Sequence, residues 1–140
     1  MRSKPILIDG GFFEDDRGRL DFVNDFDASE IKRMYFITNT MVDFFRGWQG
    51  HKIETRWFFC VKGKFEIKLV EIDNWANPAN NIEPEVYILE EENPKVLYIP
   101  KGYLNGFKSL EKNSKLMVFS DFKLGINPND DVRFESDKWQ

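Results

Sequence analysis

The chain contains one histidine, His51, in the segment Arg46-Gly47-Trp48-Gln49-Gly50-His51-Lys52. Histidine is the only side chain whose unperturbed pKa places its change of charge near neutral pH. Here the imidazole lies between a guanidinium and an ammonium group, and neighbouring cations lower the pKa of a histidine. A neutral imidazole can accept a proton. The segment therefore favours His51 as a general base, and the alternative is a core histidine with purely structural hydrogen bonds.

A metal centre is not expected around His51. Zinc, iron and copper sites use several imidazole or thiolate ligands, and this chain offers a single imidazole with scattered carboxylates. Glu54 is the nearest carboxylate after His51 in the sequence, and one carboxylate does not complete such a site. We therefore predict no bound metal.

The composition predicts one β-rich domain. The 140 residues are 41% hydrophobic and 16% aromatic, which is enough to bury a single core over residues 1–140. Aromatic residues fit the pleated surface of a sheet. The net charge of −4 gives no reason to expect nucleic acid as a partner. Small anions remain possible ligands where basic residues converge.

The only cysteine, Cys60, lies in an apolar run over residues 57–61. A single cysteine forms no intrachain disulfide, and a reducing compartment fits this. We interpret Cys60 as a buried and inert thiol. No leader-like segment opens the chain and no apolar run approaches the length of a membrane span. We expect a soluble, cytoplasmic protein with no membrane partner.

Short stretches of strand-forming residues alternate with turn residues along the chain. The clearest strand, 65–72, alternates apolar and polar side chains. We expect further strands at 5–8, 20–23 (half-buried), 31–38, 56–61, 86–89, 96–99 and 116–120, with loops at 14–18 and 73–84 and turns at 62–64 and 100–102. Such a pattern indicates a sandwich or barrel. Its exposed edge strands predict a homodimer, and the tail from Asn127 carries aromatic residues that should pack.

Several motifs then follow one another in a recognisable order. They are Asp16-Arg17-Gly18, Lys32-Arg33-Met34-Tyr35, the segment 46–52, Gly63 and Ile99-Pro100-Lys101-Gly102-Tyr103-Leu104-Asn105-Gly106-Phe107. This order resembles the RmlC-like cupins over nearly the whole chain. The two most similar branches are the dTDP-4-keto-6-deoxyglucose 3,4-ketoisomerases (WxcM-like) and the dTDP-4-dehydrorhamnose 3,5-epimerases. The resemblance implies an all-β cupin jelly roll, that is, a double-stranded β-helix.

Gln49 departs from both branches. The ketoisomerase pattern Arg-Gly-x-His-x-His-Lys maps onto 46–52, so Gln49 replaces its first histidine and stands where the epimerases carry their base. Phe122 stands at the position of the epimerase tyrosine acid. Metal-binding cupins use a His-x-His pair and a later histidine, and those positions are Gln49-x-His51 and Asn105 here. Gln49 can still exchange hydrogen bonds with a sugar; alternatively, the site binds a nucleotide sugar without catalysis.

The resemblance implies an isomerase for a dTDP-linked 4-keto-6-deoxyhexose. Such an enzyme removes a proton next to the ketone and needs no cofactor, because the substrate's own carbonyl makes that proton acidic. The implied catalytic set is His51 as base, Tyr35 or a water as acid, and Gln49 as a hydrogen-bond partner of the sugar. Arg17 and Arg46 are implied to clamp the diphosphate. The remaining substrate-binding candidates are Lys52, Tyr103, Asn105 and Asp121, and Asp121 is also a candidate for orienting His51.

Overall fold

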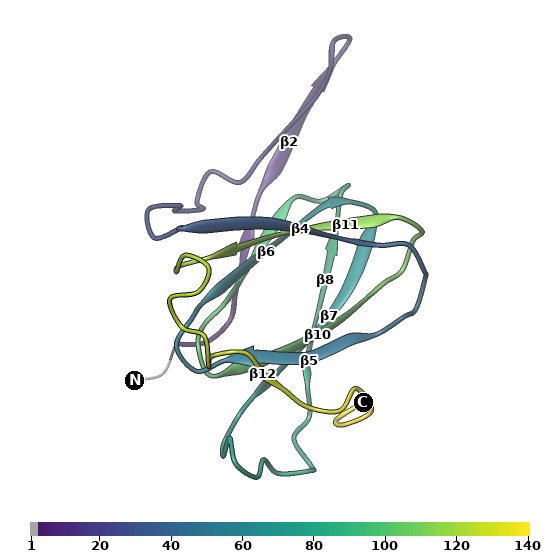
Figure 1. The fold of residues 1–140 in the computed structure, drawn as a ribbon. Helices are drawn as coiled ribbons and strands as arrows, with labels where there is room; N and C mark the ends of the chain where they lie inside the picture. The colour runs from purple at the N-terminus through teal and green to yellow at the C-terminus, as the bar shows by residue number, and fades with distance from the viewer. Residues whose placement is uncertain (1–2) are drawn as a thin grey trace.

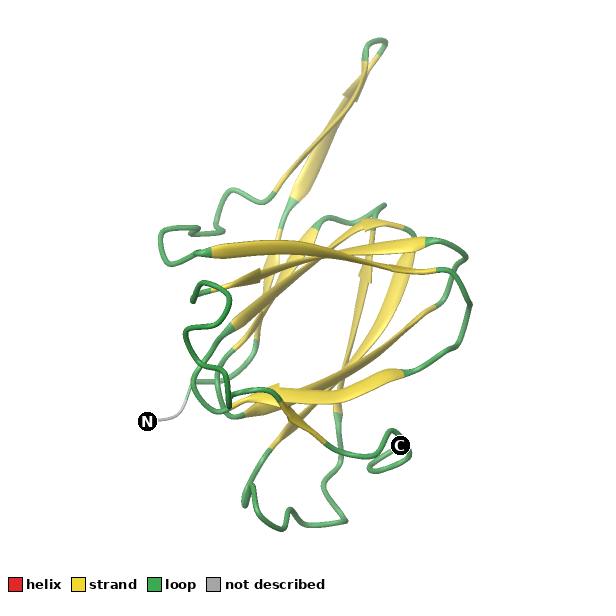
Figure 2. Cartoon of the chain, in the orientation of Figure 1, coloured by secondary structure: helices red, strands yellow, loops and turns green. Residues whose placement is uncertain are grey.

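A computed structural model describes residues 3–140 of the chain, which form strands and no helix (Figure 2). No helix in that range could therefore cross a membrane. The strands are β1 (Ile6–Asp9), β2 (Gly11–Asp15), β3 (Gly18–Phe22), β4 (Arg33–Asn39), β5 (Arg46–His51), β6 (Arg56–Lys62), β7 (Lys64–Glu71), β8 (Glu85–Glu90), β9 (Lys95–Ile99), β10 (Tyr103–Ser109), β11 (Ser114–Ser120) and β12 (Val132–Arg133).

Two five-stranded antiparallel sheets form the body of the protein. Their strand orders are β1-β9-β6-β11-β4 and β12-β5-β10-β7-β8. The sheets face each other across the interior, and apart from β7 and β8 the neighbouring strands in each sheet are not consecutive in the sequence (Figure 1). This arrangement confirms the predicted all-β cupin jelly roll.

The space between the sheets is filled by an apolar core at one end. Phe65, Ile67 and Leu69 alternate along β7 with polar residues, and all three are fully buried. They pack against side chains from the facing sheet, including Phe58 and Leu116. Full burial of one such side chain contributes about 1.5–3 kcal/mol. The alternation that predicted the strand therefore also supplies the core.

The C-terminal tail packs against the body, as predicted, and the structure shows that it does so on the outer face of the second sheet. Trp139 and Trp48 pack edge to face with ring centroids 5.7 Å apart, within a second buried cluster. Trp139 Nε1 donates to the carbonyl of Ala79 at 2.7 Å, which joins the tail to the loop over residues 73–84. The strand β12 then adds to the edge of the sheet beside β5. The tail is thus an integral part of the fold.

The segment after β1 differs from the prediction. Residues 14–18 were expected to be a loop, and 20–23 a half-buried strand; instead β2 and β3 form a hairpin that projects from the body (Figure 1). Its apolar side chains are exposed, with Phe13 and Leu20 both at 61%. Alternation in sequence indicated a strand but could not reveal that the strand has no core to pack against.

Glycine residues make β10 of the second sheet difficult to predict from the sequence. The residue pair Gly47 and Gly106 lies where β5 and β10 approach closely, and a Cβ on Gly47 would lie 2.7 Å from the Cα of Gly106. Gly47 also has a φ of 157°, which side-chain-bearing residues rarely adopt. Glycine is depleted in strands, so the 103–109 strand was not predicted, and only the turn at 100–102 before it was.

The thiol of Cys60 should be unreactive in the folded protein. Cys60 is 3% exposed, and burial raises the pKa of its thiol to about 12. We expect a disulfide reagent at pH 8 to modify the native protein at least ~10²-fold more slowly than the guanidinium-unfolded chain, because the thiolate is the reacting species. Equal rates of modification before and after unfolding would contradict this placement of the thiol.

Candidate active site

The interior of the jelly roll becomes polar at one end. Ser120 on β11 pairs with Arg33 on β4 and with Arg56 on β6, so these three side chains share the inner face of the first sheet. On the facing sheet Asn105 pairs with Gln49 in the same way. Alternation along the strands therefore directs charged and amide groups into the barrel here, where the opposite end carries apolar side chains.

A cavity of about 190 Å³ lies between these polar rows. An adjoining hollow of about 480 Å³ shares much of its wall and is bounded by the tail. The polar residues that line one or both are Arg33, Tyr35, Arg46, Gln49, His51, Glu54, Arg56, Asn105, Asn127, Asp130, Asp131 and Arg133. Four arginines and three carboxylates line the adjoining hollow. Two of these arginines are paired with carboxylates there, so Arg33 and Arg46 are the cations that can favour an anionic ligand.

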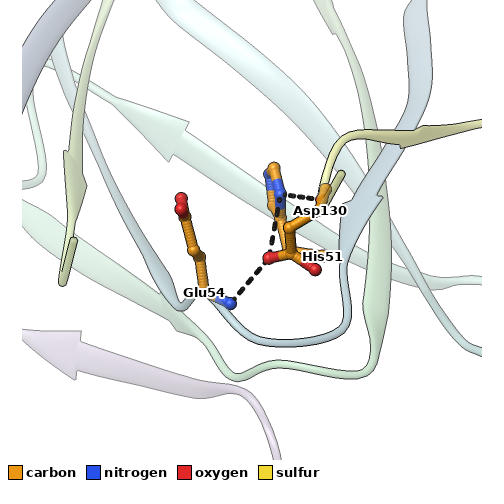
Figure 3. A group of neighbouring side chains, drawn as sticks. All are labelled: His51, Glu54 and Asp130. Atoms are coloured by element: carbon orange, nitrogen blue, oxygen red, sulfur yellow. Dashed lines mark hydrogen bonds and ion pairs between the residues drawn. The ribbon is translucent and has the colours of Figure 1, made fainter. Parts of the chain in front are cut away.

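His51 lies in this wall with only 7% of its surface exposed. Its Nδ1 is 2.8 Å from the backbone carbonyl of Asp130 (Figure 3). A carbonyl only accepts hydrogen bonds, so Nδ1 carries the proton and Nε2 of the neutral ring is left as the basic atom. Burial lowers the pKa of His51, and the charge of Arg56 lowers it further. The surroundings of His51 therefore favour the neutral imidazole, which can accept a proton at Nε2.

The cation that acts on His51 is thus Arg56, and not the sequence neighbours Arg46 and Lys52 from which a lowered pKa was predicted. Burial is the larger cause. The direction of the prediction is confirmed, and its physical origin is different.

The tail holds the turn that follows His51. The carboxylate of Asp130 accepts hydrogen bonds from the backbone N–H groups of Lys52 (2.7 Å), Ile53 (3.0 Å) and Glu54 (2.9 Å). Figure 3 shows Asp130 reaching both His51 and the Glu54 backbone. Each of these N–H groups would cost about 1–3 kcal/mol if it were buried without a partner. Asp130 therefore fixes both the ring and the adjacent backbone.

Glu54 and Arg56 form a buried ion pair beside His51, with Arg56 Nη1 2.8 Å from Glu54 Oε1. Glu54 Oε2 accepts a hydrogen bond from Asn127 at 3.1 Å. Burial acts to raise the pKa of Glu54, but the hydrogen bonds from Asn127 and Arg56 outweigh it and the pKa is lowered. Glu54 is therefore ionised and is not a proton donor at neutral pH.

The side chains of His51, Glu54 and Asp130 place potential metal-ligand atoms within 4.8 Å of one another. The hydrogen bonds described above already occupy both carboxylates and Nδ1 of His51. A metal would have to displace an arginine, an asparagine and three backbone N–H groups, so this group is a hydrogen-bonded network and a poor metal site.

Gln49 is held by the tail as well. Its Nε2 donates to Asp131 Oδ1 at 2.9 Å, and Arg133 pairs with the same carboxylate at 3.1 Å. Burial acts to raise the pKa of Asp131, but Arg133 and Gln49 outweigh it and the pKa is lowered. A carboxylate only accepts, so Gln49 Oε1 is the atom left to accept a hydrogen bond from a sugar hydroxyl.

The structure brings together five of the residues selected from the sequence: His51, Tyr35, Gln49, Arg46 and Asn105 all line the cavity. They come from β4, β5 and β10, which are adjacent only in the folded barrel. Tyr35 contributes its ring from the inner face of β4, with the guanidinium of Arg33 4.4 Å from the ring centroid.

Four predicted residues lie elsewhere. Arg17 is at the tip of the β2–β3 hairpin, where it pairs with Asp15 and does not reach the cavity of its own chain. Lys52 is exposed and lies over the ring of Trp75. Tyr103 is buried in the apolar core. Asp121, a candidate for orienting His51, instead accepts a hydrogen bond from the backbone of Thr55. The orienting contact to His51 is made by the backbone carbonyl of Asp130.

Sequence analysis missed the charged residues Arg33, Arg56, Arg133, Asp130 and Asp131 as parts of the site. Arg56 did carry a signal, because a charged residue opened a strand that was otherwise buried. Asp130 and Asp131 carried none, since the tail reads as a polar segment until its return to β5 is known.

A family model described as FdtA: WxcM-like, C-terminal, matches residues 4–133. The chain therefore belongs to the WxcM-like C-terminal family. A comparison with the curated proteins finds no match.

Solved structures share the fold at low sequence identity. A 3,4-ketoisomerase from Helicobacter canadensis is 24% identical with a TM-score of 0.72, over 95% of this chain and 92% of that one. The WlaRB TDP-quinovose 3,4-ketoisomerase from Campylobacter jejuni is 23% identical with a TM-score of 0.71, over 95% of each chain. The rmlC epimerase of Mycobacterium tuberculosis is 16% identical with a TM-score of 0.74, over 93% of this chain and 68% of that one.

Because His51 is the only histidine in the chain, its titration can be followed by NMR without ambiguity of assignment. We expect the NMR titration of the His51 ring protons to have a midpoint below 6.5, because burial and Arg56 lower its pKa. The folded state then binds fewer protons than the unfolded state, so folding stability should fall as the pH drops below 6.5.

The His51→Gln variant is the control, since it should lose the ring signal and the part of the pH dependence that His51 causes. A midpoint at or above 6.5 would show that the imidazole is not held neutral by its surroundings.

Proposed function

We propose that the protein is a nucleotide-sugar isomerase that acts on a dTDP-linked 4-keto-6-deoxyhexose. The observation that carries this proposal is the geometry of His51: its Nδ1 is bound to the carbonyl of Asp130, and its Nε2 has no hydrogen-bond partner among residues 3–140 and adjoins a hollow that Arg33 and Arg46 also line. A histidine must be unprotonated to act as a base on a carbon acid, and cations stabilise a bound nucleotide diphosphate. The family and the fold support the same substrate class. The reduced, buried Cys60 fits the cytoplasmic location that we also propose.

The proposed reaction moves a carbonyl between neighbouring carbons. His51 Nε2 takes the proton from C3, the C3–H electron pair forms a C3=C4 bond, and the C4 oxygen takes a proton from Tyr35 or a water. The enediol then loses its O3 proton and receives a proton at C4, which leaves a ketone at C3. No electrons enter or leave overall, so no redox cofactor is involved.

The diphosphate is proposed to bind at the outer part of the cavity. Arg46 is exposed there and, within residues 3–140, has no ion pair that would satisfy its charge. Arg33 lines the same hollow from the facing sheet. Guanidinium groups bind phosphate oxygens in pairs. Gln49 Oε1 and Asn105 are positioned to hydrogen-bond the sugar deeper inside.

The competing proposal is a non-catalytic cupin that binds a nucleotide sugar or another small anion. Gln49 motivates it, because an amide cannot replace a titrating histidine. The isomerase proposal is favoured because His51 retains the environment of a base: a fixed tautomer, a lowered pKa and access to the cavity.

We also propose that the protein acts as a homodimer through the outer face of the first sheet. Register places the exposed side chains of Ile6 and Met34 in one cross-strand row, and Phe36 follows on β4. These residues are 50–56% exposed, and a broad apolar face of this kind marks an interaction surface. Arg17 could contact a bound ligand only in the cavity of a second copy of the chain, because the β2–β3 hairpin projects away from the cavity of the same copy.

Catalysis is tested by incubating the protein with dTDP-4-keto-6-deoxyglucose in D2O and following deuterium in the sugar by NMR. We expect incorporation next to the ketone. Replacement of His51 by Gln or Ala should reduce the rate by roughly 10²–10⁴-fold, because general-base catalysis contributes that much.

Lys52→Ala is the matched control, since Lys52 is the chain neighbour of His51 but points away from the cavity, and it should exchange at nearly the wild-type rate. Tight binding of the sugar nucleotide with no exchange in the wild type would favour the binding protein instead.

The dimer is tested by sedimentation. Wild-type protein should sediment at twice the 16.6 kDa chain mass, and the Met34→Glu/Phe36→Glu variant should sediment as a monomer because charge is placed on the apolar face. Val86→Glu is the control, because Val86 is equally exposed (55%) but lies on β8 of the other sheet. A wild-type monomer at micromolar concentration would contradict the proposal.

A further inference from the structure

Arg56 is buried with part of its guanidinium unpaired. The residue is 5% exposed, on the inner face of β6. All of its hydrogen bonds are made by Nη1, to Glu54 Oε1 (2.8 Å), Ser120 Oγ (2.8 Å) and the carbonyl of Thr55 (3.3 Å). Nε is fully buried with no hydrogen-bond partner among the described residues. Buried donors are nearly always paired, so an unpaired one calls for an explanation.

The unpaired side of Arg56 belongs to the same cavity as His51. Arg56 lines both the inner cavity and the adjoining hollow, and its charge adds to the effect of burial in lowering the pKa of His51. Its partner Glu54 accepts a further hydrogen bond from Ser120 at the same oxygen, Oε1, and one from Asn127 at Oε2. The ion pair therefore fixes the guanidinium by Nη1. Nε is too deeply buried to meet a ligand, so Nη2, which makes no hydrogen bond among residues 3–140, is the donor left for one.

We propose that Arg56 is a catalytic residue of the isomerisation, which donates to the keto oxygen and stabilises the negative charge that forms there when His51 removes the proton. This inference rests on the proposed function and adds the electrophile that the reaction needs. Preorganised donors aimed at a developing oxyanion are most effective where water is excluded. Arginine also stays charged at every pH at which His51 is neutral.

The other arginines of the cavity fit this role less well. Arg133 is 68% exposed at its side chain and is paired with Asp131. Arg46 is also exposed, and Arg33 is half-buried. Water screens charges in such positions. Among the four, Arg56 alone combines deep burial, an unpaired donor and an influence on the base.

The rival explanation is that Arg56 only neutralises Glu54. Removal of one partner from a buried ion pair leaves an uncompensated charge and destabilises the fold. The test therefore uses the double variant Glu54→Gln/Arg56→Gln, from which the entire ion pair is absent. It is compared with Glu54→Gln, which loses only the carboxylate and keeps Arg56. Thermal unfolding of both variants shows that they are folded before activity is compared.

The first measurement is deuterium exchange into the dTDP-4-keto sugar at saturating substrate. The proposal predicts that the double variant is roughly 10²–10³-fold slower in kcat than Glu54→Gln, the loss typical of a missing oxyanion donor. If the two variants exchange at similar rates, Arg56 has a structural role only and the proposal is overturned, while the isomerase function stands.

The second measurement does not depend on turnover. The keto sugar nucleotide, labelled with ¹³C at its carbonyl carbon, is bound to His51→Gln protein with and without the Glu54→Gln/Arg56→Gln change. Arg56 should move the carbonyl resonance downfield by polarising the C=O bond. A downfield shift with no exchange in the wild type would support the contact and overturn the isomerase proposal, and no shift, or no binding, would overturn the contact.

Discussion

The hydrogen bond from His51 Nδ1 to the carbonyl of Asp130 is the contact on which the site depends. It selects the tautomer of the only imidazole in the chain and sets which nitrogen faces the cavity. The same residue caps three backbone N–H groups through its carboxylate, so ring and turn are fixed by one side chain and one carbonyl. A segment about 80 residues away in sequence thereby determines the protonation chemistry of β5.

The barrel supports this polar network through a division of its interior. One end is filled by residues such as Phe65 and Ile67, which exclude water completely. The other end holds the buried Glu54–Arg56 ion pair. Removing this pair from water costs free energy, and the cost is offset because most of its polar atoms make hydrogen bonds. Burial at the apolar end thus stabilises the fold and offsets the free-energy cost of desolvating the charged end. Electrostatic interactions are strong at that charged end because water is largely excluded.

Local sequence predicted most of the fold because its strands alternate strongly, as in 65–72. It failed where the physical determinant was non-local. The exposure of Phe13 on the hairpin depends on what the rest of the chain leaves uncovered, and the strand at 103–109 depends on a close backbone approach between Gly47 and Gly106.

The residues of the site were likewise predicted where the determinant was local in the sequence and missed where it was a tertiary contact. His51, Gln49 and Arg46 were found because they lie together in one motif, and Tyr35 and Asn105 because the family pattern names their positions. Arg56 and Asp130 act through tertiary contacts that no spacing along the chain encodes. Asp121 was a candidate for orienting His51, as carboxylates do in dyads, but its carboxylate accepts a hydrogen bond from the backbone N–H of Thr55.

The brevity of β12 has a consequence for local opening. The ladder that fastens the tail to β5 consists of two residues, extended by a reciprocal pair of hydrogen bonds between Phe134 and Trp48. Edge elements with few bonds detach at a fraction of the free energy of global unfolding. Each detachment exposes the backbone amides of residues 52–54 to solvent and allows the His51 ring to change tautomer. A single opening equilibrium therefore governs both the exchange protection of these amides and the fraction of molecules in which the His51 proton is on Nδ1.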